Sequence, residues 1–370
     1  MAVASARQHE LVCFGVSGGR QVTDDSEGTS IPVAREALRT LIYGYASTQL
    51  LSIAARLRLA AHLATGPLPL LDLAARADVD PDMLRRIVNG LAAIGVVGVA
   101  ENGEYHLTAI GEGLREDVPG SLASFAILSG EDYYRAWLGV DLESHDDVTP
   151  FARVFGAPVF DWYAQHPEAG DRFYQRMTTR IMSYAATVAA VADLSAAGRI
   201  VDIGGGHGLL LAAFLERWPA ARGVLFDLPG AAAAGQARLA AAGLGDRVET
   251  VGGDFFAETE FLPEGDVYLL SQILHDWNDE RSMAILRNVR RVINPEGRLL
   301  IVEVLMPERV AGPHPAVDLD LLMMVLTGGR ERTASEHRTL LEETGFALER
   351  VHEAIALGGM SVLEVRPARV

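Results

Sequence analysis

The sequence predicts an α/β protein with a C-terminal, Rossmann-like, doubly wound sheet and an N-terminal, mainly helical region that contains a winged helix. The chain has 370 residues, more than one domain usually holds. Its first half shows apolar residues at helical spacing, whereas strand-like and helical segments alternate in its second half. These patterns divide the chain into a leader (1–30), a winged-helix domain (31–110), a helical linker (111–195) and a sheet domain (196–370).

Composition indicates a globular protein with a sizeable core, since 49% of the residues are hydrophobic and 22% are charged. Residues 1–30 are rich in glycine, serine and acidic residues, which predicts a flexible leader, and their short apolar stretch lacks the features of a signal peptide. No apolar run approaches the roughly 20 residues that span a bilayer. A single cysteine, Cys13, excludes an internal disulfide and a multi-cysteine metal site. We therefore expect a cytoplasmic protein without a membrane partner.

The N-terminal region has the element pattern of a winged helix. The expected elements are a long helix (32–63), a helix–turn–helix (70–78 and 82–94) and a hairpin (96–100 and 105–107). Asp80 is suited to cap the second helix of the helix–turn–helix, with Pro81 in its first turn.

Winged helices often bind DNA, and that alternative has to be weighed. The helix that would read DNA carries Arg85 and Arg86 but also Asp82, and the formal net charge of the chain is −17. Phosphate binding depends on clustered lysine and arginine. We therefore expect no nucleic-acid partner and a winged helix that serves packing.

Residues 115–190 are expected to be largely helical and are dense in aromatic side chains. Most of these side chains would be ordinary core. So dense a set next to a sheet domain could also wall a pocket for a flat ligand.

The sheet domain is predicted from strand-like segments of the sequence. The expected parallel strands are residues 200–203, 223–227, 248–252, 267–271 and 299–304, and the expected antiparallel edge pair is 348–354 and 361–365.

A glycine-rich loop follows the first strand. A dinucleotide fingerprint that starts at Gly204 would need glycine or alanine where Leu209 stands. The pattern present is Asp202-x-Gly204-x-Gly206-x-Gly208, which resembles the first motif of the class I methyltransferases. Glycines at such a turn let the backbone approach a ligand closely.

Acidic residues also end the second and third strands. Asp227 could accept both hydroxyls of a ribose, whereas Asp254 could accept from an adenine amine and Phe255 could cover the ring. The alternative is that the two carboxylates only cap the segments that follow them.

Three segments in the second half resemble those of the plant caffeate-type and bacterial polyketide-tailoring O-methyltransferases. They are Leu-Leu-Ser-Gln-Ile-Leu-His-Asp-Trp at 269–277, Ile-Val-Glu at 301–303 and Gly-Gly-Arg-Glu-Arg-Thr at 328–333, and the likeness extends over 35–367. The resemblance implies S-adenosylmethionine as cofactor, S-adenosylhomocysteine as product, no metal, and a winged-helix domain that dimerises the chain. It therefore predicts a homodimeric enzyme, typical of antibiotic biosynthesis.

The resemblance assigns His275 as general base, with Glu303 and Glu331 holding its imidazole. Methyl transfer to oxygen requires the acceptor hydroxyl to lose its proton. A phenol has a pKa of about 10, and free imidazole has one of about 6.5. Neighbouring carboxylates favour protonated imidazole and so reduce the difference between the two pKa values. The site therefore suits a phenol better than an aliphatic alcohol.

Further contacts also come from the resemblance. Ser271 stands where many plant members carry a lysine, so its contact to the cofactor must be shorter or absent. The acceptor side chains implied are Met177, Ile181, Met323 and Met324, with Trp137, Phe160 and Trp162 nearby. Methionines suit a planar ring, but at helical spacing they serve equally well as core.

The sequence therefore predicts an O-methyltransferase that acts on a small aromatic acceptor, such as a polyketide or another secondary metabolite. Two alternatives stay open. One is a fold-mate that uses the same cofactor for decarboxylation or hydroxylation, and the other is a winged-helix regulator that senses a small molecule.

Overall fold

The structure, a computed structural model, describes residues 31–144, 146–257 and 262–369. The expected leader, 1–30, lies outside the described residues. The chain forms two compact units, which divide after Gly130. This boundary falls inside the segment expected to be a linker, and the finer division at residues 110 and 195 stays a prediction.

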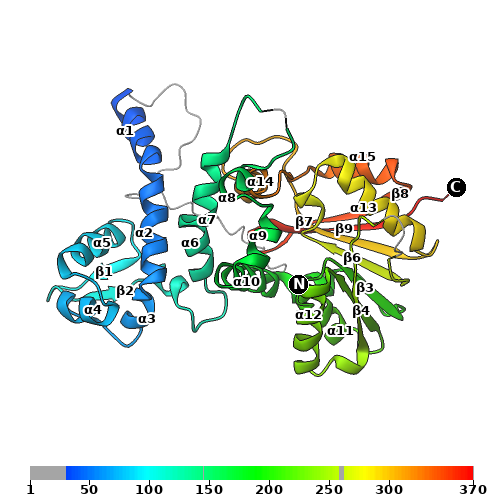
Figure 1. Ribbon diagram of the computed structural model, residues 1–370, viewed down its shortest axis with the longest axis horizontal. Coiled ribbons are helices and arrows are strands. Elements are labelled where there is room, and N and C mark those ends of the chain that lie inside the picture. Colours follow the sequence, from blue (N-terminus) through cyan, green and yellow to red (C-terminus); the bar gives the residue numbers. More distant parts are fainter. Residues whose placement is uncertain (1–30, 145, 258–261, 370) are drawn as a thin grey trace, which may run out of the picture. The chain divides into compact units, whose positions relative to one another are not determined.

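The N-terminal unit is helical with one small hairpin (Figure 1). Its elements are α1 (Ile31–Ile42), α2 (Gly44–Arg56), α3 (Leu59–Leu63), α4 (Leu70–Ala77), α5 (Pro81–Ala93), β1 (Val97–Val99), β2 (Tyr105–Leu107), the 3-10 turn η1 (Gly111–Leu114) and α6 (Ala123–Gly130). The order α4, α5, β1, β2 is the expected winged helix, and β1 pairs antiparallel with β2. Asp80 caps α5 by accepting a hydrogen bond from the Met83 amide, as predicted.

One expectation for this unit was wrong. The single helix predicted over 32–63 is three helices, α1 to α3, separated at Tyr43 and at Leu57–Arg58. Arg58 has φ 51° and ψ 36°, a left-handed conformation that no α-helix continues through. The apolar spacing gave no sign of this break, because Leu59 and Leu63 beyond it still face the same core.

The C-terminal unit begins with the helices of the aromatic-rich segment. They are α7 (Asp132–Ala136), the 3-10 turn η2 (Trp137–Gly139), α8 (Pro150–Phe155), α9 (Val159–Gln165) and the long α10 (Pro167–Val191). Thr149 caps α8 through the Ala152 amide, with Pro150 in its first turn.

A seven-stranded sheet follows, in the order β5-β4-β3-β6-β7-β9-β8. Its strands are β3 (Arg199–Ile203), β4 (Arg222–Asp227), β5 (Val248–Gly252), β6 (Val267–Ser271), β7 (Arg298–Val304), β8 (Phe346–Ala356) and β9 (Met360–Pro367). Strands β3 to β7 pair in parallel, whereas β9 runs antiparallel between β7 and β8. All the expected strands are present, and the expected antiparallel edge pair is confirmed.

Helices and short turns connect these strands. They are α11 (Leu209–Arg217), α12 (Pro229–Ala241), η3 (Gly245–Arg247), η4 (Leu274–Asp276), α13 (Asp279–Val292), α14 (Pro315–Leu326), α15 (Ala334–Glu343) and η5 (Leu357–Gly359). In the described part of the chain, no helix is both long enough and apolar enough to cross a bilayer.

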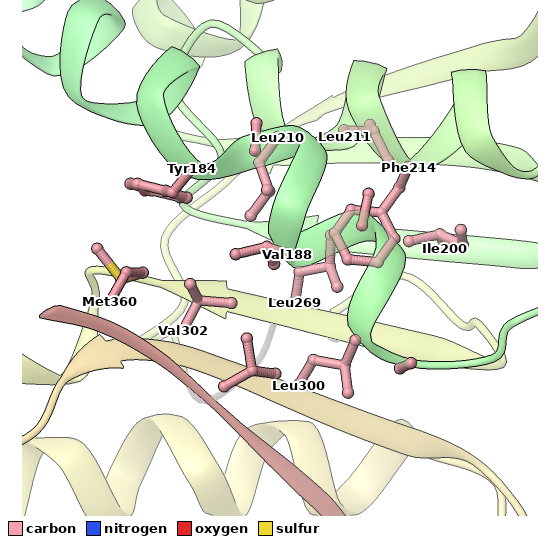
Figure 2. Close-up of a cluster of buried hydrophobic side chains, with 14 of the residues drawn as sticks. Tyr184, Val188, Ile200, Leu210, Leu211, Phe214, Leu269, Leu300, Val302 and Met360 are labelled. Carbon is pink, nitrogen blue, oxygen red and sulfur yellow. The ribbon is translucent and has the colours of Figure 1, made fainter. Parts of the chain in front are cut away.

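Both faces of the sheet are buried, as a parallel sheet requires. On one face Leu269 and Leu300 pack against α10 and α11, together with the side chains labelled in Figure 2. On the other face Tyr268 and Leu270 pack with side chains of α13 and α15, since successive strand residues point to opposite sides. The chain leaves β3 for β4 on one side and later returns to β6 on the other. The carboxyl ends of β3 and β6 therefore border the crevice where doubly wound sheets bind ligands.

Candidate active site

The loop after β3 is built for close approach of a ligand. Gly204, Gly206 and Gly208 have φ values of 68°, 56° and 72°, a region that disfavours side chains. A Cβ on Gly204 would lie 2.5 Å from the Ile273 side chain and 3.7 Å from that of Phe255. At these positions the backbone of the loop, and no side chain, therefore lines the edge of the sheet.

Two acidic residues flank this loop. Asp202 is 1% exposed, and neither of its carboxylate oxygens has a well-aligned hydrogen-bond partner among the described residues. Burial, and then the charge of Asp227, raises the pKa of Asp202 to about 7. Asp227 accepts the amides of Gly206 and Leu228, both at 2.7 Å, and burial raises its pKa. Through the Gly206 amide, Asp227 links the end of β4 to the glycine loop. This contact goes beyond a cap of the helix that follows, α12.

The other expected cofactor contacts lie at neighbouring strand ends. Asp254 is exposed and accepts the Phe256 amide at 2.9 Å, which is the contact expected of a local cap. Phe255 is half-buried beside Phe256, with ring centroids 4.8 Å apart. The Ser271 hydroxyl at the end of β6 lies 3.1 Å from the Tyr184 hydroxyl. These positions fit a nucleoside along the sheet edge, and the individual contacts stay predictions.

His275 lies in η4, just beyond β6, and is 7% exposed. Its Nδ1 is 2.7 Å from Oε1 of Glu331 and 3.6 Å from Oε2 of Glu303. Its Nε2 is 3.8 Å from Oδ1 of Asp276. The structure therefore brings together the three residues that the sequence analysis grouped.

The two glutamates do different things. Glu303, near the end of β7, accepts the amides of Ile273 and Leu274 at 3.1 Å and the side-chain amide of Gln272 at 3.0 Å. Gln272 has a φ of 56°, so the chain turns sharply there. Glu303 thus holds the backbone of the loop that carries His275. Of the two glutamates, Glu331 alone is within hydrogen-bond distance of the imidazole, at 2.7 Å against 3.6 Å for Glu303.

Burial shifts the ionisation of the carboxyls around the imidazole. It raises the pKa of Glu331 to about 8, although the charge of Arg180 acts against the shift. It raises the pKa of Asp276 to about 7 and that of Glu303 as well, with the charge of His275 opposing both shifts. Near neutral pH the site therefore contains carboxyls poised between their charged and neutral forms.

These three residues are also chemically possible metal ligands, with ligand atoms within 4.8 Å of one another. The oxygens of Glu303, however, face N–H donors from Gln272, Ile273 and Leu274. Donors of this kind repel a cation, so the donor set fits a hydrogen-bonded base better than a metal.

Two residues that contact the backbone of the His275 loop were not predicted from the sequence. Arg332 is fully buried, donates to the carbonyls of Leu274 and Trp277 at 2.9 and 2.8 Å, and pairs with Asp279 at 2.8 Å. Gly329 packs so tightly that a Cβ there would overlap the His275 carbonyl. Both belong to the Gly-Gly-Arg-Glu-Arg-Thr segment, so that segment itself was the available signal.

The expected acceptor residues fall into three environments. Met323 is 6% exposed and packs in the core, whereas the adjacent Met324 is 39% exposed. Trp162 lies within an aromatic cluster, 4.9 Å from Phe155 between ring centroids. Met177 and Ile181 are half-buried on α10, and Trp137 and Phe160 are exposed. Met323 is therefore a core residue, which was the alternative to a place in the acceptor pocket. The pocket role of the other residues stays a prediction.

Known proteins resemble this chain over nearly its whole length. The family model of the O-methyltransferase domain matches residues 137–347, and that of the O-methyltransferase dimerisation domain matches residues 40–116. The phenazine O-methyltransferase PhzM of Lysobacter antibioticus is 42% identical over 348 residues, which cover 94% of this chain and 100% of that protein.

Solved structures are similar as well. The crystal structure of LaPhzM has a TM-score of 0.82 and 43% identity, and the match covers 90% of this chain and 99% of that chain. The O-methyltransferase NcsB1 from neocarzinostatin biosynthesis, in complex with S-adenosylmethionine and 2-hydroxy-5-methyl naphthoic acid, has a TM-score of 0.75 and 29% identity over 87% and 96% of the two chains. The chain therefore belongs to the S-adenosylmethionine-dependent O-methyltransferases of bacterial secondary metabolism.

Proposed function

We propose that the protein methylates a phenolic hydroxyl of a small aromatic acceptor and that His275 is the general base. The observation that carries this proposal is the 2.7 Å contact between His275 Nδ1 and Glu331. When Nδ1 donates to the Glu331 carboxylate, the proton is held on that nitrogen and the lone pair of Nε2 is left to accept another. Nε2 has no described hydrogen-bond partner, and its nearest carboxylate oxygen, on Asp276, is 3.8 Å away.

S-adenosylmethionine supplies an activated methyl group on a sulfonium. In this proposal His275 Nε2 takes the proton of the phenol as the oxygen–methyl bond forms and the sulfur–methyl bond of the cofactor breaks, which would release S-adenosylhomocysteine. Glu331 and Asp276 would stabilise the resulting imidazolium in their ionised forms, and because burial raises their pKa values to about 8 and about 7, the share of ionised carboxyl grows as pH rises through that range. Glu303 and Arg332 position the loop, Glu303 through backbone amides and Arg332 through backbone carbonyls. Asp227 would take the ribose and Phe255 would cover the adenine at the sheet edge.

The acceptor class rests on two supports. A phenol has a pKa of about 10, and an imidazole that donates to a carboxylate can act as the base that removes its proton. An aliphatic alcohol is far less acidic and therefore suits this base less well. Relatives of this chain are named for phenazine methylation or hold a naphthoic acid, which are flat aromatic molecules. Met177, Ile181 and Met324 would contact the ring of such an acceptor.

We also propose that the enzyme works as a homodimer. The dimerisation-domain match covers residues 40–116. In the adjoining α1 no residue is buried, and the exposed side chains include Leu38 and Leu41. An apolar helix left uncovered by its own unit is suited to a second copy of the chain.

The experiment is His275→Gln, with His352→Gln on β8 as the matched control. The His275 variant should bind S-adenosylmethionine normally and lose about 10²–10⁴-fold in turnover at neutral pH. Its activity should partly recover towards the pKa of the phenol, where solvent can remove the proton. His352→Gln should keep its activity.

A turnover deficit equal at pH 7 and pH 9.5 would show that His275 only binds the acceptor. Mass spectrometry of the product separates added methyl from lost carbon dioxide or added oxygen, so it also tests the alternative chemistries.

A further inference from the structure

Tyr184 is a buried tyrosine near the carboxyl end of the sheet. It lies on α10, is 1% exposed, and packs among the apolar side chains drawn in Figure 2, on the side where Val302 lies near the end of β7. Its hydroxyl lies 3.1 Å from the hydroxyl of Ser271, the last residue of β6. Phenylalanine would fill the same core position without a polar group, so packing does not account for the hydroxyl.

The direction of this hydrogen bond follows from the chemistry of the two hydroxyls. Burial raises the pKa of Tyr184 to about 12, so its phenol keeps its proton. A phenol is far more acidic than an aliphatic hydroxyl and is the stronger donor of the two. Tyr184 therefore donates to Ser271, and the Ser271 hydroxyl keeps its own proton for a further partner. Among the described residues, Tyr184 is the one hydrogen-bond partner of the Ser271 side chain.

The register of the sheet places Ser271 beside the glycine loop. Leu270 lies opposite Ile203 of β3, so Ser271 and Gly204 leave these two parallel strands side by side. On its other side Ser271 pairs with Val302 of β7. Ser271 therefore lies at the crevice where doubly wound sheets bind ligands.

The order of the strand ends decides which part of the cofactor Ser271 would meet. Adenine and ribose are proposed to lie at Asp254 and Asp227, after β5 and β4, and these two strands are on the far side of β3 from β6. The methylated sulfur follows the ribose and has to reach an acceptor beside His275, which follows β6. The amino-acid end of the cofactor, with its ammonium and carboxylate, would therefore lie over the ends of β3 and β6.

We propose that Tyr184 positions the Ser271 hydroxyl so that Ser271 binds the amino-acid end of S-adenosylmethionine. Ser271 would donate its proton to the carboxylate, and its remaining lone pair would be open to the ammonium. A hydroxyl that already accepts a hydrogen bond is a stronger donor, so Tyr184 would strengthen a contact that it does not itself make. This inference rests on the placement of the cofactor in the proposed function.

Calorimetry with two ligands tests this role. S-adenosylhomocysteine carries the amino-acid end, whereas 5′-methylthioadenosine has the same nucleoside and sulfur without it. Tyr184→Phe removes the hydroxyl and keeps the ring, so it should weaken S-adenosylhomocysteine binding about 3- to 10-fold and leave 5′-methylthioadenosine binding unchanged. Ser271→Ala should lose at least as much. In the Ser271→Ala background Tyr184→Phe should cause no further loss, because the two hydroxyls act in series.

Tyr268→Phe is the matched control. Tyr268 is also fully buried, but it lies near the amino end of β6 and donates to the Pro263 carbonyl at 2.9 Å. Its substitution should leave the affinities for both ligands unchanged. Urea denaturation checks that each variant is folded. If Tyr184→Phe does not fold, Tyr184→Met replaces it, because methionine also lacks the hydroxyl and fills irregular core space.

A Tyr184→Phe enzyme that binds S-adenosylhomocysteine as tightly as the wild type overturns the inference. So does an equal loss of affinity for both ligands, since Tyr184 would then support the nucleoside site or the fold alone. A loss that persists in full in the Ser271→Ala background also overturns it, because Tyr184 would not act through Ser271.

The same measurements separate this inference from the proposed function. If Tyr184→Phe loses affinity for S-adenosylhomocysteine alone but His275→Gln keeps its turnover, the proposed function fails and the role of Tyr184 stands. If Tyr184→Phe changes neither affinity while His275→Gln behaves as proposed, the proposed function stands and this inference fails.

Discussion

Asp202→Asn tests whether the enzyme holds a buried carboxyl under its glycine loop at a cost in stability. Asp202 is 1% exposed, and burial raises its pKa from 3.8 to about 7. At about 1.4 kcal/mol per pKa unit, this difference corresponds to about 4 kcal/mol between the protonated and the ionised carboxyl. Asparagine has nearly the same shape and carries no charge at any pH.

The direction of the effect follows from the raised pKa. Below pH 3.8 the carboxyl is protonated in both the folded and the unfolded chain, and its stabilising effect is complete. As pH rises towards about 7 the unfolded chain ionises first, and the wild type loses stability. The difference in free energy of unfolding should therefore shift in favour of the asparagine variant by up to about 4 kcal/mol between pH 4 and 7 and then level off.

Urea denaturation of the cofactor-free protein at a series of pH values measures this difference. Other titrating groups largely cancel, because both proteins share them. Asp254→Asn is the matched control, since Asp254 is exposed and exchanges at exposed positions have small effects. A difference between Asp202→Asn and the wild type that stays constant from pH 4 to 8 would refute the reasoning.

Two further predictions concern the cofactor and the oligomer. Asp227→Ala should weaken S-adenosylmethionine binding by about 2 kcal/mol or more, because it removes the carboxylate expected at the ribose. Unchanged affinity of the folded variant by calorimetry would exclude that role. For the homodimer, Leu38→Glu combined with Leu41→Glu should convert a dimer into a monomer in light scattering, since both exposed side chains lie on α1. A wild type already monomeric at micromolar concentration would count against the dimer.

The sequence by itself determined the order of the elements and the position of the glycine loop. Strand-like and helical segments alternate with local periodicity, and glycine spacing reports a backbone requirement at single positions. It also singled out His275, Glu303 and Glu331, because they belong to segments that resemble a known family. The comparisons confirmed the family, the fold and the cofactor.

Only the tertiary structure decided what each residue contacts. Nothing in the spacing of Glu303 and Glu331 indicates that the first accepts loop amides while the second contacts the imidazole. Met323 and Met324 are neighbours in sequence, yet one packs in the core and the other is exposed, because helical rotation turns them to different surroundings. Burial and charge partners depend on residues far apart in the chain, so local patterns do not contain them.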